Sequence, residues 1–194
     1  MKTFLPAIRM FIALTVLTGA IYPLIVTGIA KAVFPNRASG SLVAENGKIV
    51  GSALLAQRFS SDKYFWPRPS AGDDGTNYAT VPSSASNLGP TSSNLVAAVQ
   101  SRLAAFLAAN GLATNTPVPS EMVFTSGSGL DPDISPAAAR LHIDRVAQAR
   151  HFSPAQKQKL VALVGQSIQP PQFGFLGEPR VNVLKLNRAL DGFK

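Results

Sequence analysis

The chain has 194 residues, enough for one globular domain and a short extra element, because a single hydrophobic core typically takes about 100 to 200 residues. Its formal net charge of +8 would suit nucleic acid or an anionic membrane surface, but no three basic residues are adjacent. Such dispersed charge indicates a solvated surface, so no nucleic-acid partner is expected. With no cysteine and two histidines, the composition gives no basis for a disulfide framework and little for a zinc site.

The N-terminal part of the chain predicts a membrane-spanning helix. No residue between Met10 and Ala30 is charged, and at about 1.5 Å of rise per residue this run covers roughly the 30 Å of a bilayer core. A cleaved signal peptide is the alternative, because basic residues precede the run and Ala30-Lys31-Ala32 imitates a cleavage site. The run is longer than the roughly 7 to 15 apolar residues of a signal peptide. We therefore expect a retained anchor over residues 10–34.

The flanking charges predict the orientation of this span. Two basic side chains and the α-amino group precede it, and two basic side chains follow it closely. This small excess favours a single-pass protein of the inner (plasma) membrane, with residues 1–9 in the cytoplasm and a soluble domain, residues 35–194, outside it. No acidic residue lies in the span, so the chain has no carboxylate there to bind or relay a cation. It is not expected to transport ions by itself.

One face of the span gathers small and hydrogen-bonding residues. Thr15, Thr18, Gly19 and Tyr22 recur at spacings of three and four, which places them on one side of a helix. Such a face lets a partner helix approach closely; the alternative is that the threonines bond to carbonyls of their own helix. Pro23 removes one backbone hydrogen bond and predicts a kink.

The remaining sequence predicts an α+β fold, with a small sheet packed against about three helices. Residues 41–55 indicate a β-hairpin, because Asn46-Gly47 suits the type I′ turn between two apolar segments. A helix is expected from about residue 93 to residue 110, stopped by Gly111 in the left-handed conformation.

The last third of the chain predicts two strands and two helices. A short strand is expected at residues 122–125 and a buried strand at residues 179–186, where apolar residues alternate with one slip. Between them, residues 135–150 and 153–168 each open with Ser-Pro, which places a capping hydroxyl before a proline in the first helical position.

A long loop, residues 66–93, is rich in Pro, Ser, Gly, Asn and Asp, and loops of this length are usually tied to function or to partner contact. It follows three consecutive aromatic residues, Tyr64-Phe65-Trp66, and this segment is expected to be ordered. A membrane-anchored extracytoplasmic module that binds a ligand near residues 64–87 is therefore one functional hypothesis.

Two sequence patterns suggest chemistry that their context does not support. Ser126-Gly127-Ser128-Gly129 is glycine-rich, but it lacks the lysine and the following helix of a phosphate-binding loop, so a tight turn that positions Leu130 and Asp131 is favoured. His142 and Asp144 are two residues apart on a predicted helix, where they point in different directions, so no hydrolase triad is expected and His142 should be partly buried. The helix pair resembles a helix-turn-helix, but an extracytoplasmic domain does not meet DNA.

The remaining candidate residues are structural or interfacial. Arg68 and Arg145 are expected to bond loop carbonyls or Asp131, because a guanidinium suits planar acceptors. Asn182 and Asn187 are expected to bond backbone groups at the ends of the last strand. Ser126 and Ser128 join this set through the tight turn. No catalytic or metal-binding residue is assigned.

Several segments resemble the KdpC family, the small subunits of Kdp-type potassium-transporting ATPases. Each is weak alone, but together they follow the family's order and approximate spacing along nearly the whole chain. They are Thr18-Gly19-Ala20-Ile21-Tyr22-Pro23-Leu24, Phe34-Pro35, Gly51-Ser52-Ala53-Leu54-Leu55-Ala56-Gln57-Arg58-Phe59, Tyr64-Phe65, Arg68-Pro69-Ser70-Ala71, Ser86-Asn87-Leu88-Gly89-Pro90, Ser126-Gly127-Ser128-Gly129-Leu130-Asp131-Pro132, Arg145-Val146-Ala147-Gln148-Ala149-Arg150, and Gly177-Glu178-Pro179-Arg180-Val181-Asn182-Val183-Leu184-Lys185-Leu186-Asn187.

This resemblance implies an accessory subunit of a high-affinity potassium uptake complex. Its partners would be a channel-like potassium-binding subunit, a P-type ATP-hydrolysing subunit, a very small membrane peptide and the lipid bilayer. It also implies a catalytic chaperone that raises the ATP affinity of the hydrolysing subunit, with ATP itself as a possible ligand. Where family members carry Gly-Gln before Phe-Pro, this chain has Ala30-Lys31, so a role resting on that glutamine does not carry over. An extracytoplasmic domain also argues against direct contact with cytoplasmic ATP.

Overall fold

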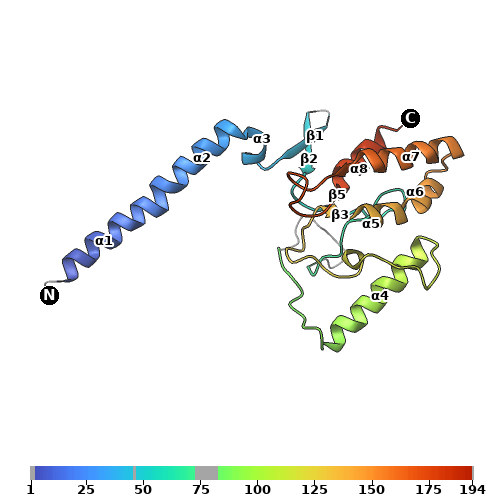
Figure 1. The fold of residues 1–194 in the computed structure, drawn as a ribbon, viewed down its shortest axis with the longest axis horizontal. Helices are drawn as coiled ribbons and strands as arrows, with labels where there is room; N and C mark the ends of the chain where they lie inside the picture. The colour runs from blue at the N-terminus through green and yellow to red at the C-terminus, as the bar shows by residue number, and fades with distance from the viewer. Residues whose placement is uncertain (1–2, 46, 73–82, 194) are drawn as a thin grey trace. The chain divides into compact units, whose positions relative to one another are not determined.

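The computed structural model describes residues 3–45, 47–72 and 83–193. The chain divides into two compact units, residues 1–52 and residues 53–194 (Figure 1). The first unit holds the N-terminal helix and a hairpin. The second holds five α-helices, one 3₁₀ turn and a three-stranded sheet among its described residues, so the mixed α+β class is as predicted.

The N-terminal helix is continuous from Phe4 to Val33 and is long and apolar enough to cross a membrane. It consists of α1 (Phe4–Val16), a π-helical turn (Leu17–Ile21) and α2 (Tyr22–Val33). The π turn lies directly before Pro23, whose ring would otherwise meet the carbonyl four residues back. Next to the position of the predicted kink the helix has one widened turn, in which the Tyr22 N–H donates to the Leu17 carbonyl.

A short helix and a hairpin complete the first unit. Helix α3 (Pro35–Ala38) follows Phe34, and strands β1 (Leu42–Glu45) and β2 (Lys48–Ser52) pair antiparallel, as predicted. The turn residue Asn46 lies outside the described residues. Gly47 has a φ of 77°, a conformation that glycine adopts without strain.

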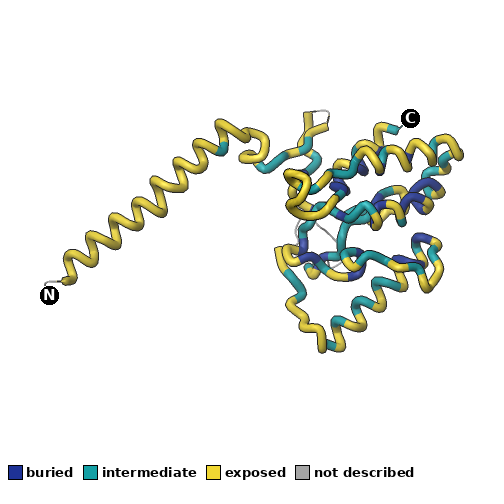
Figure 2. The backbone as a smooth tube through the Cα atoms, in the orientation of Figure 1, coloured by how far each residue is buried: buried dark blue, intermediate teal, exposed yellow. Residues whose placement is uncertain are grey.

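The second unit places its helices around one core. The elements are α4 (Ser93–Ala109), α5 (Pro136–Leu141), α6 (Ile143–Ala149), α7 (Pro154–Gln166) and α8 (Val183–Asp191), with strands β3 (Asp133–Ile134), β4 (Ile168–Gln169) and β5 (Arg180–Asn182) in the order β3-β5-β4. Helix α7 packs against α5, α6 and α8 (Figure 1). Figure 2 shows buried residues concentrated in these helices, and the N-terminal helix exposed along its length.

The predicted helix starts are confirmed by their caps. Ser135 accepts a hydrogen bond from the Ala138 N–H, and Ser153 forms a capping box with Gln156. Helix α4 ends before Gly111, whose φ of 62° is the predicted left-handed stop. A Ser-Pro start and a terminal glycine act within one turn of their own helix, and the observed helix ends follow these local signals.

Three predictions about the last third of the chain were wrong. The strand at residues 122–125 is a 3₁₀ turn (Ser120–Met122) followed by irregular chain. The helix at residues 135–150 is interrupted at His142, whose ring bonds the Ala138 carbonyl while its backbone N–H moves to Ala139. The strand at residues 179–186 ends at Asn182, and α8 begins at Val183 because the Asn182 side chain caps it.

Candidate functional site

The exposed N-terminal helix carries the predicted partner face. Thr15, Thr18, Gly19 and Tyr22 are all exposed, and no atom lies within 4 Å of the position a side chain would take at Gly19. The Thr18 hydroxyl donates to the Leu14 carbonyl at 2.7 Å, as the alternative interpretation of the threonines expected. The face remains a predicted helix-docking surface, since small residues leave space along it.

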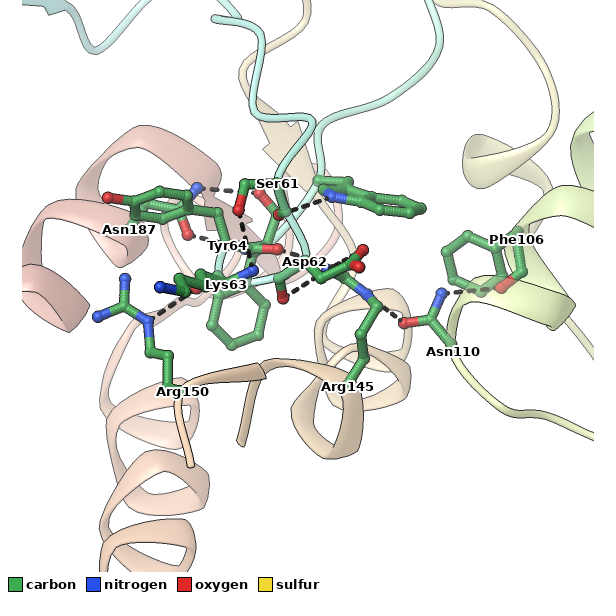
Figure 3. Close-up of polar contacts among 11 residues, drawn as sticks. Ser61, Asp62, Lys63, Tyr64, Phe106, Asn110, Arg145, Arg150 and Asn187 are labelled. Carbon is green, nitrogen blue, oxygen red and sulfur yellow. Dashed lines mark hydrogen bonds and ion pairs between the residues drawn. The ribbon is translucent and has the colours of Figure 1, made fainter. Parts of the chain in front are cut away.

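Side chains from two helices of the second unit hold residues 61–66, which we name the clamped segment (Figure 3). Arg145 donates to the Asp62 and Tyr64 carbonyls at 2.7 and 2.9 Å. Asn187 accepts from the Phe65 N–H and donates to the Phe65 carbonyl, both at 2.9 Å. The prediction that the aromatic segment is ordered is confirmed, because side chains of α6 and α8 form hydrogen bonds with its backbone.

Arg145 is the most constrained of the predicted residues. Its side chain comes from α6, is only 5% exposed as a residue, and also donates to the Asn110 side chain at 3.0 Å. Its guanidinium carbon lies 4.0 Å from the centre of the Trp66 ring. Burial lowers the pKa of Arg145 to about 10, opposed by nearby Asp62, so the side chain stays charged at neutral pH. The predicted bonding of Arg145 to loop carbonyls is confirmed.

His142 was predicted to be partly buried, but it is fully buried. Its Nδ1 lies 2.8 Å from the Ala138 carbonyl, and its Nε2 has no hydrogen-bond partner in the part of the chain that the structure describes. The rings of Phe65, Trp66 and Phe106 surround it, with centres 6.0, 6.2 and 5.2 Å away. Burial, reinforced by the positive charge of Arg145, lowers the pKa of His142 to about 3. The ring therefore stays neutral and serves as a core side chain.

The hydrolase arrangement considered for His142 does not form with Asp144. The Asp144 carboxylate lies 2.7 Å from the Lys157 ammonium group, and both side chains are largely exposed. His142 immediately precedes α6 and is buried, whereas the Asp144 side chain in the first turn of α6 is exposed, so the two side chains point in different directions, as predicted.

Arg68 and Asp131 meet in a charged cleft of about 500 Å³. The Arg68 guanidinium donates to the Asp131 carboxylate at 2.6 Å, which is the predicted contact. Arg180 pairs with Asp133 at 3.1 Å, and Asn182 donates to the same carboxylate at 3.1 Å. Desolvation raises the pKa of Asp133, opposed by the hydrogen bond from Asn182 and the charge of Arg180. Each aspartate thus has an arginine partner, and this pairing compensates charge within the cleft.

The acidic side chains of the charged cleft are spread along its lining. Across residues 3–45, 47–72 and 83–193, no three His, Asp or Glu side chains gather closely enough to hold a metal ion. Glu121 also lines the cleft, and it accepts a hydrogen bond from the Ser135 N–H at 3.3 Å.

The serine-glycine turn at residues 126–129 joins distant segments of the second unit. The Ser128 carbonyl accepts from the Ser84 N–H and the Ser83 hydroxyl, both at 2.9 Å. Gly129 has a φ of 70°, and a side chain there would lie 2.6 Å from the Ser84 carbonyl oxygen. The buried Ser126 hydroxyl has no partner among the described residues. The predicted tight turn is confirmed, and its role is to hold the end of the long loop.

The two predicted asparagines belong to α8 and its cap. Asn182 accepts from the Lys185 N–H and donates to the Ala53 carbonyl at 2.9 Å. Asn187 lies inside α8 and bonds the clamped segment, so its predicted place at a strand end was wrong while its bonding to backbone was right.

Comparison with protein families covers both units. The chain matches the KdpC family model, described as the c chain of a K⁺-transporting ATPase, over residues 4–192. The chain belongs to the KdpC family. Relatives named "Potassium-transporting ATPase KdpC subunit" include one from Rhodospirillum rubrum, 51% identical over 98% of this chain and 96% of the relative. One from Dechloromonas aromatica is 51% identical over 98% of each chain, and one from Mycobacterium tuberculosis is 46% identical over 98% of each chain.

KdpC membership assigns this chain to a potassium-transporting ATPase as one of its subunits. The KdpC match includes the exposed helix as well as the clamped segment and the charged cleft. Arg68, Arg145 and Asn187 make the internal contacts described above.

Sequence reasoning missed two features of this KdpC chain. Arg150 donates to the Lys63 carbonyl at 2.8 Å, which adds a second arginine to the clamp (Figure 3). Arg150 also pairs with Asp191 at 2.8 Å. An exposed turn, residues 171–177, displays Phe173 and Phe175. The signal for this turn was a Pro-Pro pair followed by apolar residues and two glycines, which the strand-based reading of residues 179–186 left aside.

Proposed function

We propose that the chain is an accessory subunit of an ATP-driven, high-affinity potassium uptake complex that does not itself hydrolyse ATP. In this role it stabilises the assembly and acts as a catalytic chaperone that raises the ATP affinity of the hydrolysing subunit. The observation that carries the proposal is the match to the KdpC family over residues 4–192, on a chain whose described polar clusters are bonded internally.

The proposed arrangement follows the charges that flank the exposed helix. The helix spans the inner (plasma) membrane with its N-terminus in the cytoplasm. The face with Thr15, Gly19 and Tyr22 meets a helix of the channel-like potassium-binding subunit or of a very small membrane peptide subunit. The second unit then lies outside the cytoplasm, over the outer face of the potassium-binding subunit.

Direct contact with ATP fits the described residues poorly. In the serine-glycine turn, the Gly129 N–H donates to the Ser126 carbonyl and the Leu130 N–H donates to the Ser128 hydroxyl. These donors are therefore engaged and not directed at an anion, and the turn has no lysine. We derive the proposed effect on ATP affinity from contacts between subunits, transmitted through the membrane assembly.

Purification from membranes in mild detergent tests the proposal most directly. With an affinity tag on the full-length chain, co-elution of a P-type ATPase is the expected result. A monodisperse single chain would overturn the assignment and would support a membrane-anchored ligand-binding module instead. The apparent KM for ATP should rise when the chain is omitted from the complex, and an unchanged KM would contradict the chaperone role.

A single cysteine tests the orientation, because the natural chain has none. Ser83 is exposed, so Ser83→Cys should react with a membrane-impermeant maleimide added outside intact spheroplasts. Labelling only after the cytoplasmic face is opened would overturn the extracytoplasmic placement.

A further inference from the structure

Residues 171–177, which we name the phenylalanine turn, form the tip of the connection between β4 and β5. Phe173 is 87% exposed, Phe175 is 75% exposed and Leu176 is also exposed. All residues from Gln172 to Pro179 are exposed, and the loop beside β5 is drawn as exposed in Figure 2. Single apolar side chains are common on surfaces, but three within four residues form a patch that marks contact sites.

The phenylalanine turn extends well beyond what its strands require. Strands β4 and β5 are antiparallel neighbours, with Gln169 opposite Arg180. Hairpin loops of about two to five residues suffice to join such strands. The additional residues add no member to the hydrophobic core of the second unit. Their length thus serves to present the tip away from the sheet.

The backbone of the phenylalanine turn is ordered by its own hydrogen bonds. Gln172 and Leu176 exchange two backbone hydrogen bonds, each 2.9 Å long. Gly174 and Gly177 have a φ of 84°, and Phe173 has a φ of 55°, a conformation that a residue with a side chain seldom adopts. The backbone that carries the two aromatic rings is therefore ordered before any contact is made. Such preorganisation reduces the ordering cost of binding and is typical of a specific protein contact.

The charges near the phenylalanine turn favour a protein pocket over a lipid surface. Residues 170–177 contain no Lys or Arg that would attract anionic lipids, and no Trp or Tyr of the kind enriched at membrane interfaces. The next residue is Glu178, which is exposed and negatively charged, and the nearby Arg180 is paired with Asp133. A lipid-binding loop usually combines apolar side chains with basic ones. The phenylalanine turn has the apolar side chains but not the basic ones.

We propose that the phenylalanine turn inserts Phe173 and Phe175 into an apolar pocket on the extracytoplasmic face of another protein subunit of the potassium-transporting ATPase. This inference rests on the proposed function, because it names a contact by which the accessory subunit is held in the complex. Two exposed phenylalanine rings offer roughly 300 Å² of apolar surface, on the scale of about 150 to 250 Å² buried by each such side chain. That is enough for a central anchor of an interface.

Co-purification with a matched control tests the contribution of the two rings. The full chain carrying Phe173→Ser and Phe175→Ser is expressed with the other subunits, and its yield with a tagged ATP-hydrolysing subunit should fall at least tenfold. A control with Val96→Ser and Val161→Ser removes two other exposed apolar side chains, on α4 and α7, and should co-purify as the unchanged chain does. Equal yields for the two double variants would overturn the inference. If the unchanged chain itself fails to co-purify, the proposed function fails instead.

Photo-crosslinking identifies what the turn touches. Benzoylphenylalanine at position 175 should give a crosslink to one other subunit on irradiation of membranes, whereas the same probe at exposed Phe124 should not. Crosslinks at position 175 to lipid alone, or to a second copy of this chain, would overturn the inference. Thermal unfolding of the purified Phe173→Ser, Phe175→Ser chain should match that of the unchanged chain, because both rings are exposed and outside the core.

Discussion

At the scale of single residues, the buried polar side chains of the second unit hold its irregular segments in place. Arg145 bonds three groups from two different segments, and Asn187 bonds both backbone groups of Phe65. A buried backbone group without a partner is costly, so these side chains supply what a neighbouring strand would supply elsewhere. The clamped segment is therefore irregular chain whose backbone groups are hydrogen-bonded by side chains, whereas in a sheet a neighbouring strand would bond them.

Replacing Arg145 with Lys tests this role while keeping the charge. A lysine has no planar fork, so it cannot reach the Asn110 side chain and the Asp62 and Tyr64 carbonyls together. We expect the free energy of unfolding to fall by about 2–4 kcal/mol, because buried acceptors are left unpaired. Denaturant unfolding of the full chain in mild detergent, followed by the fluorescence of Trp66, the single tryptophan, measures the change.

A matched substitution on the preceding helix, α5, controls this experiment. Arg140 is exposed, so Arg140→Lys should change the unfolding free energy by less than about 0.5 kcal/mol. An Arg145→Lys chain as stable as the Arg140→Lys chain would show that the clamp does not depend on the guanidinium.

His142 makes the stability of the second unit depend on pH. Its pKa falls from an ordinary 6.5 to about 3 on folding, so the unfolded chain takes up the proton first as pH falls. The stabilisation is complete above pH 6.5 and is lost as pH falls from there towards 3. Lowering the pH from 7 to 5 should therefore reduce the unfolding free energy by about 2 kcal/mol through His142 alone.

A non-titrating replacement isolates this effect from other groups. His142→Phe keeps an aromatic ring of similar size among Phe65, Trp66 and Phe106. The difference in unfolding free energy between the natural and variant chains should shift by about 2 kcal/mol from pH 7 to pH 5. Asp133, whose pKa is raised and whose effect has the opposite sign, is common to both chains and cancels. A difference that does not change with pH would contradict the buried, neutral state of His142.

At the scale of elements, the sequence predicted what local signals control and failed where the tertiary environment decides. Ser135, Ser153 and Gly111 begin or end helices by contacts within one turn, so these two helix starts and this helix end were predicted correctly. Helix α8 was read as a strand because Val181, Val183 and Leu184 suggested alternation. The decisive feature is the Asn182 cap together with buried residues at helical spacing, from Val183 to Leu190.

The candidate site was predictable only where one residue type has a strong partner preference. An arginine near backbone carbonyls or an aspartate is such a case, and the Arg68 and Arg145 contacts followed. The burial of His142 depends on three rings from two separate segments, Phe65 and Trp66 in one and Phe106 in the other, and nothing local indicates that they converge. The phenylalanine turn was missed for the reverse reason, since apolar residues are expected inside.

In the serine-glycine turn, both the backbone conformation and the space around residue 129 require glycine. A methyl group there would lie 2.6 Å from the Ser84 carbonyl oxygen and 2.9 Å from the Ser70 hydroxyl, at a φ of 70°. Gly129→Ala should lower the unfolding free energy by about 2–4 kcal/mol, from backbone strain and displacement of residue 84. Gly127→Ala, two residues away in the same turn with no atom within 4 Å, is the control and should be close to neutral. Equal stability of the two variants would refute the tight junction at Ser84.

At the scale of the whole molecule, the two units divide the work of an accessory subunit. The first unit contributes an exposed apolar helix of 30 residues. The second unit contributes a folded body whose charged groups are largely paired within it. The proposed stabilising role uses both surfaces, and the helix face can be tested independently of the folded body.

The two glycines of the N-terminal helix provide that test. Gly19 lies in the π turn, on the face with Thr15 and Tyr22, whereas Gly28 is nine residues further along in α2 and on a different side of the helix. Neither has an atom within 4 Å of the position of an added side chain, so both Gly19→Leu and Gly28→Leu should leave the chain itself intact. Because a close helix contact depends on small residues, Gly19→Leu should reduce co-purification with the other subunits at least tenfold, by more than about 1.4 kcal/mol of association free energy. Gly28→Leu should retain it, and equal loss from both would mean that the helix is gripped all round and not by the Thr15–Tyr22 face.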